Sequence, residues 1–332
     1  MSWFSKSLMV DIVKKTAADA YDAAERIVGR VDRTELIRSD HFSELLSANV
    51  FFKLENLQTT GSFKLRGATN RLMILSDEEC VQGCVTASSG NHGAAVACAM
   101  QTLGATGVIF VPEQTSAAKI DKIKGYNGDV RLFGTDGLDT EQHAREYARR
   151  NHMTYLSPYN DENVIAGQGT CGVELLEQMP EINAVFVAVG GGGLVGGVGS
   201  VLKAHDSNIR VYGCQPVASA VMAHSIVAGE ILDMPSDPTL SDGTAGGIEA
   251  GSITFELNQA VVDEFVMVDE SAIAAAMRVY VHSENQVIEG AAGVAIAALL
   301  ERSDAVAGQN IAVIVCGGNI ADDALSKIMA ES

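Results

Sequence analysis

The sequence predicts an α/β protein built on an open, doubly wound, mostly parallel sheet with two lobes. Three observations carry this prediction. Segments of strand and helix character alternate over most of the 332 residues, which is the order of β-α-β units with helices on both faces of a sheet. Residues 184–189, 209–213 and 311–315 are continuous apolar runs, as strands buried on both faces are. No low-complexity linker divides the chain, so a second lobe must be inserted in the main sheet.

The individual elements follow from local patterns. Apolar positions recur at helical spacing over residues 8–28 and predict a helix there. Further strands are expected at residues 83–87, 106–111, 130–133 and 153–156, alternating with helices at 91–103, 116–126, 138–151 and 163–179. Asn127-Gly128 and Pro180 end two of these helices. We expect residues 76–160 to form a small lobe and residues 1–75 and 161–332 to form a large one.

Composition and charge narrow the class of partner. A hydrophobic content of 47% and a charged content of 20% describe a globular chain that can bury a large core. The net charge of −19 disfavours binding to nucleic acid or to an anionic membrane surface. The six cysteines include no C-x-x-C pair, and the N-terminus has no secretory pattern. These features predict a cytoplasmic protein with reduced thiols and a small-molecule partner.

Four consecutive glycines, at positions 190–193, follow an apolar strand and precede an expected helix. Without Cβ atoms, several backbone N–H groups can converge on one anion, and the helix N-terminus adds its positive end. Gly191, Gly193 and Gly196 also fit the G-x-G-x-x-G pattern of dinucleotide sites, but residues 211–215 offer no acidic residue at the end of the next strand. Close packing of the helix on the strand is the alternative explanation, but it would account for one or two glycines and not for four in a row. The run therefore predicts a site for a single phosphate group.

The segment Ser88-Ser-Gly-Asn-His-Gly93 lies between a predicted strand and a predicted helix. Its amides and hydroxyls could bind a carboxylate at the helix N-terminus. An ordinary helix cap explains Ser or Asn at this place equally well. For His92, a capping or core position is the competing interpretation.

Lys64 and Cys316 are the candidate reactive and ligand-facing side chains. Phe63 and Leu65 flank Lys64, and a lysine in apolar surroundings has a lowered pKa and becomes nucleophilic. A solvated surface lysine is the alternative. Cys316 directly follows an apolar strand, where open sheets place their ligand contacts, although a buried core thiol would occupy the same position.

In combination these segments resemble the fold-type II enzymes that use pyridoxal 5′-phosphate (PLP), a group with a tryptophan synthase β-like fold. Within that group the chain is most similar to the serine/threonine dehydratase and serine racemase branch. The resemblance covers about residues 30–325 and rests on four motifs: Gly61-Ser-Phe-Lys-Leu-Arg-Gly67, Ser88-Ser-Gly-Asn-His-Gly93, Ile165-Ala-Gly-Gln-Gly-Thr170 and Gly190-Gly-Gly-Gly-Leu194.

The resemblance implies a role for each matching residue. Lys64 would carry PLP as a Schiff base, Phe63 would pack against the ring, Asn91 would bind the 3′-oxygen and Cys316 would face the pyridine nitrogen. The implied phosphate ligands are the backbone amides of Gly190, Gly191, Gly192, Gly193 and Leu194. The implied ligands of the substrate carboxylate are Ser88, Ser89, Gly90 and His92.

A neutral thiol at Cys316 would make the ring a weaker electron sink than an aspartate partner would, which favours β-elimination. The resemblance thus implies a cytoplasmic, homodimeric dehydratase (ammonia-lyase). It would convert a small β-hydroxy amino acid such as L-threonine or L-serine to a 2-oxo acid and ammonia. Lys64 would remove the Cα proton. Ser89 would stand on the opposite face of the substrate, where racemases deliver a proton.

Two departures from the family pattern limit the alternatives. Gln215 and Val221 stand where racemase-like members carry acidic metal ligands, so no metal is expected. The chain stops soon after Asn319, so the C-terminal regulatory domain of biosynthetic threonine dehydratases is not expected. Serine racemase and 3-hydroxyaspartate dehydratase remain near alternatives. A nicotinamide-dependent oxidoreductase and a non-catalytic ligand-binding protein are distant ones.

Overall fold

A computed structural model describes residues 3–330 of the chain and contains two sheets. The larger sheet has the order β1-β2-β10-β7-β8-β9, and only the β1–β2 pair is antiparallel. Its strands are β1 (Leu36–Arg38), β2 (Asn49–Lys53), β7 (Ala184–Ala188), β8 (Arg210–Pro216), β9 (Glu264–Val268) and β10 (Asn310–Ile314). The smaller sheet has the order β5-β4-β3-β6 and is parallel throughout. Its strands are β3 (Cys84–Ala87), β4 (Gly107–Val111), β5 (Asp129–Leu132) and β6 (Thr154–Tyr155).

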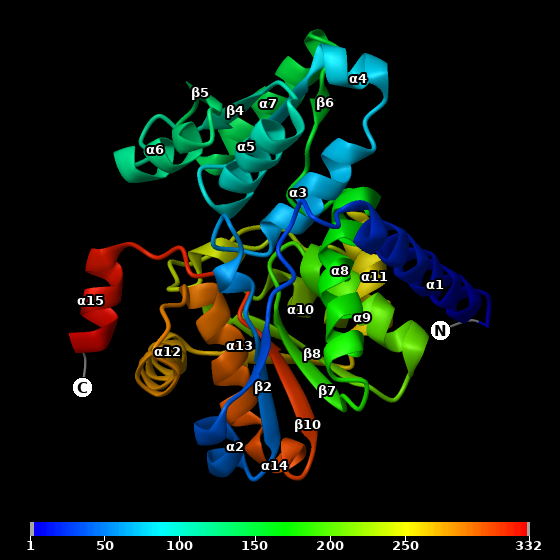
Figure 1. Ribbon diagram of the computed structural model, residues 1–332, viewed down its shortest axis with the longest axis vertical. Coiled ribbons are helices and arrows are strands. Elements are labelled where there is room, and N and C mark those ends of the chain that lie inside the picture. The colour runs from blue at the N-terminus through cyan, green and yellow to red at the C-terminus, as the bar shows by residue number, and fades with distance from the viewer. Residues whose placement is uncertain (1–2, 331–332) are drawn as a thin grey trace.

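Helices cover both faces of each sheet (Figure 1). On the larger sheet, α13 (Gly290–Glu301) packs on one face and carries α12 (Glu270–Glu284), while α9 (Gly193–His205) packs on the other face. Outside α9 lie α8 (Glu162–Gln178) and α1 (Trp3–Arg26). On the smaller sheet, α5 (Asn91–Leu103) contacts β3 and β4 and carries α6 (Ala117–Gly125), whereas α7 (Gly137–Arg150) contacts β3, β4 and β6.

The remaining elements connect these layers. The helix α3 (Lys64–Met73) packs against both α5 and α8 and so lies between the two sheets. The other helices are α2 (Asp40–Leu46), α4 (Asp77–Gln82), α10 (Val221–Ala228), α11 (Ile253–Val261), α14 (Ser303–Val306) and α15 (Asp322–Ala330). Three short 3₁₀ helices are η1 (Glu55–Leu57), η2 (Val217–Ser219) and η3 (Asp242–Thr244). Within residues 3–330, no helix combines the length and the apolar character that crossing a bilayer requires.

The predicted α/β class with mostly parallel strands and two lobes is confirmed. The predicted strands and helices between residues 83 and 189 all exist, with no end displaced by more than one residue. The first helix was predicted too late, because it begins at Trp3 rather than at residue 8 and ends at Arg26. The strands of the smaller sheet fall between residues 84 and 155, and the lobe boundaries at 76 and 160 stay a prediction.

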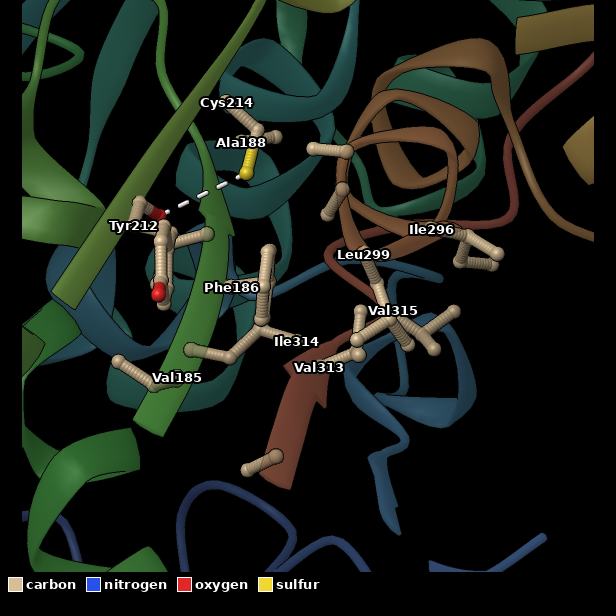
Figure 2. Packing of buried hydrophobic residues seen from close by; sticks show 14 of the residues in the cluster. Val185, Phe186, Ala188, Tyr212, Cys214, Ile296, Leu299, Val313, Ile314 and Val315 are labelled. Carbon is tan, nitrogen blue, oxygen red and sulfur yellow. Dashed lines mark hydrogen bonds between the residues drawn. The ribbon is translucent and has the colours of Figure 1, made fainter. Parts of the chain in front are cut away.

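The main core covers the larger sheet, with side chains from α13 on one side and from α8 and α9 on the other, and Figure 2 shows part of it. The rings of Phe186 on β7 and Tyr212 on β8 stack with their centroids 4.3 Å apart. Ile314 from β10 and Leu299 from α13 are fully buried near them. Each side chain of this size contributes about 1.5–3 kcal/mol when it leaves water. This rigid layer fixes the ends of β7 and β10, from which the polar loops project.

One of the matching motifs, residues 165–170, lies in α8 and serves close helix packing. A Cβ atom added at Gly167 would lie 2.6 Å from the Cα atom of Gly67 in α3. A Cβ atom added at Gly197 of α9 would lie 2.4 Å from the carbonyl oxygen of Ile165. Because both approaches are too close for any side chain, the glycines set how near α3 and α9 lie to α8.

A buried ion cluster anchors α3. The guanidinium of Arg66 is fully buried and donates hydrogen bonds to both carboxylate oxygens of Glu55 (2.7 and 2.8 Å) and of Glu174 (2.6 and 2.9 Å). Lys53, which is also fully buried, pairs with Glu174 and donates to the carbonyl oxygen of Thr34 at 2.8 Å. Burial alone would raise the pKa of Glu55, but the charge of Arg66 holds it below its ordinary value. The cluster therefore stays ionised and ties α3 to η1 and α8.

Replacing Arg66 by Met should lower the free energy of unfolding by about 3–5 kcal/mol, because the buried carboxylate of Glu55 would lose both of its hydrogen bonds from the guanidinium. Urea unfolding followed by circular dichroism measures this change. The control is Arg149→Met, which removes an exposed ion pair with Glu146 on α7 and should leave the unfolding midpoint in place. Equal midpoints for the two variants would contradict the proposed anchoring.

Candidate active site

A cavity of about 630 Å³ lies where loops from both sheets meet α3. It is bordered by the loops that follow the carboxyl ends of β3, β7 and β10, the edge at which open α/β sheets bind ligands. Every residue that the sequence predicted for the site lines this one cavity: Phe63, Lys64, Ser88, Ser89, Gly90, Asn91, His92, Gly190, Gly191, Gly192, Gly193, Leu194 and Cys316. Their grouping is a structural finding, and the role of each one stays a prediction.

Backbone contacts place Lys64 at the start of α3 and beside the end of β10. The N–H of Phe63 donates to the carbonyl oxygen of Cys316 at 3.1 Å, and Ser62 forms an isolated antiparallel bridge with Gly317. From there the Lys64 side chain enters the cavity. Its Nζ atom donates to the carbonyl oxygen of Pro158 at 2.8 Å and lies 5.1 Å from the centroid of the Phe63 ring.

Enclosure by protein atoms lowers the pKa of Lys64 to about 8, against an ordinary value of 10.5. Loss of hydration is the largest cause, and negative charge from Cys316 and Glu289 would oppose it. At neutral pH, about one tenth of the Lys64 amines are therefore neutral and able to act as a nucleophile or a base. A partly buried lysine with a lowered pKa has the properties that covalent catalysis requires.

The glycine turn between β7 and α9 presents free backbone amides to the cavity. The N–H groups of residues 190–194 donate to no acceptor within residues 3–330. Gly192 is the N-cap residue of α9 and has a φ of +84°, a left-handed conformation that favours glycine. A Cβ atom on Gly191 would lie 2.4 Å from the ring of Tyr159. The turn is thus a cradle of N–H groups at a helix N-terminus, suited to a phosphate.

The loop after β3 forms a second group of donors. The N–H of Gly90 donates to the hydroxyl of Ser88 at 3.3 Å, and α5 starts at Asn91. His92 lies in the first turn of α5 and is almost fully buried. Burial, assisted by the Lys64 charge, lowers the pKa of His92 to about 3, so its ring is neutral. The Nε2 atom lies 3.1 Å from the carbonyl oxygen of Leu156 and donates to it, which leaves Nδ1 as an unprotonated acceptor.

Glu289 is the main residue of the cavity that sequence reasoning missed. It precedes α13 and is almost fully buried. Its carboxylate accepts hydrogen bonds from Asn91 Nδ2 (2.9 and 3.0 Å) and from the N–H of Asn319 (3.1 Å). Burial raises the pKa of Glu289 to about 7, and these hydrogen bonds limit the rise. Burial also raises the pKa of the neighbouring Cys316 thiol, which stays neutral.

Other missed lining residues come from distant parts of the chain. Tyr159 follows β6, Thr244 belongs to η3, and Lys122 on α6 donates to the amide oxygen of Asn319. The N-cap position of Glu289 before the small-residue run Gly290-Ala-Ala-Gly293 was a usable local pattern. For Tyr159 and Lys122 the sequence contains no such pattern.

Gln215, which stands where racemase-like members carry a metal ligand, uses its side-chain amide for hydrogen bonds within the protein. Gln215, at the end of β8, is buried, and its Nε2 atom donates to the carbonyl oxygen of Val189 at 3.1 Å. Its Oε1 atom accepts from the N–H of Ala223 at 2.8 Å. Val221 begins α10 beside it and has an apolar side chain. The amide of Gln215 thus joins the end of β8 to α10.

Comparison with known proteins defines the class of protein. Residues 27–317 match the family described as "Pyridoxal-phosphate dependent enzyme", and the chain belongs to this family. The predicted cofactor and the predicted family are therefore confirmed. The dinucleotide interpretation of Gly191, Gly193 and Gly196 is set aside by the same finding.

Particular relatives lie in the predicted branch. The chain is 37% identical over 314 residues to the L-threonine ammonia-lyase of Thermotoga maritima, which covers 95% of this chain and 78% of that protein. The processed form of threonine deaminase isoform 2 from Solanum lycopersicum superimposes with a TM-score of 0.92 at 32% identity, over 97% of this chain and 94% of that one. Maize serine racemase superimposes with a TM-score of 0.87 at 33% identity, over 94% and 97% of the two chains.

The residues present fit PLP. The free amides of residues 190–194 suit its phosphate, and the enclosed Lys64 amine suits its aldehyde. The neutral Cys316 thiol can face the ring nitrogen without adding charge, and Asn91 is held by Glu289 at the edge of the same cavity.

Replacing Gly192 by Ala should raise the dissociation constant of PLP by at least about tenfold. The methyl group would strain a backbone with positive φ and would meet the Asn258 side chain at 2.6 Å, so the amides of the turn would move. Absorbance titration of the cofactor-free protein measures the constant. Gly125→Ala is the matched control, because an added Cβ atom there has no neighbour within 4 Å and φ is not positive. Similar constants for the two variants would contradict the cradle.

The reactivity of Lys64 in the cofactor-free protein should rise with pH and reach half its maximum at about pH 8, because only the neutral amine attacks an aldehyde. Brief treatment with formaldehyde and cyanoborohydride, followed by peptide mass spectrometry, measures methylation of Lys64 across the pH range. In protein unfolded by urea, the midpoint should move toward 10.5. Identical midpoints in the folded and unfolded protein would show that the cavity does not perturb this amine.

Proposed function

We propose that the protein is an ammonia-lyase that converts a small β-hydroxy amino acid, L-threonine or L-serine, to a 2-oxo acid and ammonia. One observation carries the proposal: the amine of Lys64 faces the same cavity as the backbone amides of the glycine turn and the N-terminus of α5. The relatives named for threonine deamination support the choice of substrate class.

The cofactor would be held through its ends. The amides of Gly190, Gly191, Gly192, Gly193 and Leu194 would bind the phosphate, and Lys64 would carry the aldehyde carbon covalently. Phe63 would pack against the ring, Asn91 would donate to the 3′-oxygen, and Cys316 would face the ring nitrogen. Once bound, PLP supplies the electron sink that makes the substrate Cα proton acidic.

The substrate carboxylate would bind at the N-terminus of α5. We assign it to the hydroxyls of Ser88 and Ser89 and to the backbone amides of Gly90 and His92. For His92 we choose the backbone N–H rather than the imidazole as the donor. The Nε2–H of the neutral ring already donates to the carbonyl oxygen of Leu156, and its Nδ1 atom has no proton to donate. The ring then orients the loop, and the helix N-terminus supplies the positive field.

Lys64 would move the proton in this reaction. After the substrate amine takes its place, the freed Lys64 amine is neutral often enough near pH 8 to accept the Cα proton. The carbonyl oxygen of Pro158, 2.8 Å from Nζ, can hold the amine in position while it carries that proton. The β-hydroxyl would take up a proton and leave as water, and water would then hydrolyse the released enamine to the 2-oxo acid and ammonia. Cys316, kept neutral by burial, would favour this elimination.

Serine racemase is the second candidate, and Ser89 is the observation that favours it. Its hydroxyl lines the cavity and would deliver a proton to the face of the substrate opposite Lys64, a step that elimination does not need. The likeness to maize serine racemase supports this candidate. Formation of D-serine from L-serine, measured against pyruvate release, separates the two activities.

The cellular setting that we propose is a cytoplasmic homodimer. The six cysteines form no disulfide within the described chain, which agrees with a reducing compartment. Light scattering of the purified holoenzyme should give twice the chain mass of 34.9 kDa. A monomeric mass would refute the dimer and leave the proposed chemistry in place.

The proposed activity predicts that purified holoenzyme releases 2-oxo acid from L-threonine or L-serine faster than from the D-isomers or from 3-hydroxyaspartate. Lys64→Ala should abolish both this release and the visible absorbance of bound PLP, since only that amine forms the covalent bond. Lys119→Ala is the control, because Lys119 also lines the cavity and its ammonium lies 3.7 Å from Asp242. Oxo-acid release that persists in Lys64→Ala would end the assignment.

A further inference from the structure

An ion contact joins the smaller sheet to a distant loop beside the cavity. Arg145 on α7 places its guanidinium 2.7 Å from the Oε1 atom of Glu249, which lies in the loop between η3 and α11. The two residues are separated by about a hundred positions in sequence and are only partly exposed, at 39% and 24%. Arg145 is itself held by Glu141 at 2.7 Å and lies over the ring of Tyr155, 4.2 Å from its centroid. These two contacts fix the orientation of the Arg145 guanidinium toward Glu249.

Glu249 in turn forms hydrogen bonds with the segment that follows β6. Its Oε2 atom accepts a hydrogen bond from Asn160 Nδ2 at 2.9 Å, and its backbone N–H donates to the hydroxyl of Tyr159 at 3.0 Å. Asn160 Oδ1 in turn accepts from the N–H of Ile253 at the start of α11. The Tyr159–Asn160 pair is therefore fixed by side-chain and backbone contacts from one loop.

Tyr159 packs against the glycine turn. Its ring packs directly on Gly191, where an added Cβ atom would lie 2.4 Å away, and its Cα atom would lie 3.2 Å from a Cβ atom on Gly193. The residue before it, Pro158, accepts the hydrogen bond from Lys64. One short segment thus contacts both the amine and the anion cradle, and both Pro158 and Tyr159 line the cavity.

We propose that Arg145 and Glu249 are positioning residues for cofactor binding: they clamp the Tyr159–Asn160 segment so that the Tyr159 ring holds the glycine turn in its anion-binding shape. Neither residue lines the cavity, so both act through Tyr159. The proposal rests on the proposed role of the glycine turn as the phosphate site.

The clamp is distinct from the other ion pairs of α7. Arg149 pairs with Glu146 on the same helix, and neither residue contacts the loop after η3 or lines the cavity. Loss of that pair changes surface charge by the same amount as loss of Arg145 does. A difference between the two arginines therefore reports the link to Glu249 rather than the charge of the helix.

The test compares four variants in the full-length protein: Arg145→Met, Glu249→Ala, Tyr159→Phe and the control Arg149→Met. The dissociation constant of PLP is measured by absorbance titration of the cofactor-free protein, with thermal unfolding recorded in parallel. The first three variants should each raise the constant about five- to tenfold, the effect of losing one ion contact or hydrogen bond of the clamp. Arg149→Met should leave it unchanged.

A double mutant identifies the route. If the Glu249 side chain acts by holding its own backbone N–H against the Tyr159 hydroxyl, adding Glu249→Ala to Tyr159→Phe should raise the constant no further. Tyr159→Phe keeps the ring on Gly191, so it tests the clamp even where Glu249→Ala folds poorly. Unchanged affinity in Tyr159→Phe, or full additivity in the double mutant, would overturn the proposal.

Gly192→Ala separates this proposal from the one on which it rests. If Gly192→Ala binds PLP like the unaltered protein, the glycine turn is not the phosphate site and the proposed function loses its support. If Gly192→Ala weakens binding while the three clamp variants do not, only the clamp is refuted. Equal KM and lowered kcat at saturating PLP in the clamp variants would also contradict it, because the clamp acts on cofactor retention.

Discussion

The buried guanidinium of Arg66 is the interaction on which the position of the site depends. It lies two residues after Lys64 in the first turn of α3 and is bound by Glu55 of η1 and Glu174 of α8. Such a charge cannot leave its partners without a large cost, so the start of α3 has one stable location. The backbone bond from Phe63 to Cys316 then sets that location against the end of β10. The amine of Lys64 is therefore placed both by the buried ion cluster and by the backbone bond to Cys316 at the cavity.

The pKa values of the side chains in the cavity are set mainly by loss of hydration and less by neighbouring charges. Burial acts on each titratable group in the direction of its neutral form: it lowers the pKa of Lys64 and His92 and raises that of Glu289 and Cys316. The lasting positive potential comes from backbone amides at the starts of α5 and α9. A chain with a net charge of −19 can thus hold an anionic cofactor and an anionic substrate carboxylate. PLP then meets an amine whose pKa is lowered to about 8, next to a neutral thiol.

Much of this arrangement could be predicted from the sequence, because its parts are local. Continuous apolar runs identified β7 and β10, and the residues after them are the glycine turn and Cys316. The strand β1 has only three residues, and β9 was not predicted although residues 265–268 are a continuous apolar run. The division into two sheets depends on pairing that local patterns do not contain. The motif at residues 165–170 was found by resemblance. Its role in helix packing could not be predicted, because it depends on close contacts with other helices that only the structure shows. Tyr159 and Glu249 carry no local pattern, since they matter only because a fold brings them to Gly191.

The most direct test of the account is to locate the bond between the protein and its cofactor. Holoenzyme reduced with borohydride and digested should yield one phosphopyridoxyl peptide, and its modified residue should be Lys64. Lys119 and Lys122 line the same cavity and serve as internal competitors. Modification of either of them in place of Lys64, or a cofactor that is fully released after reduction, would contradict the account.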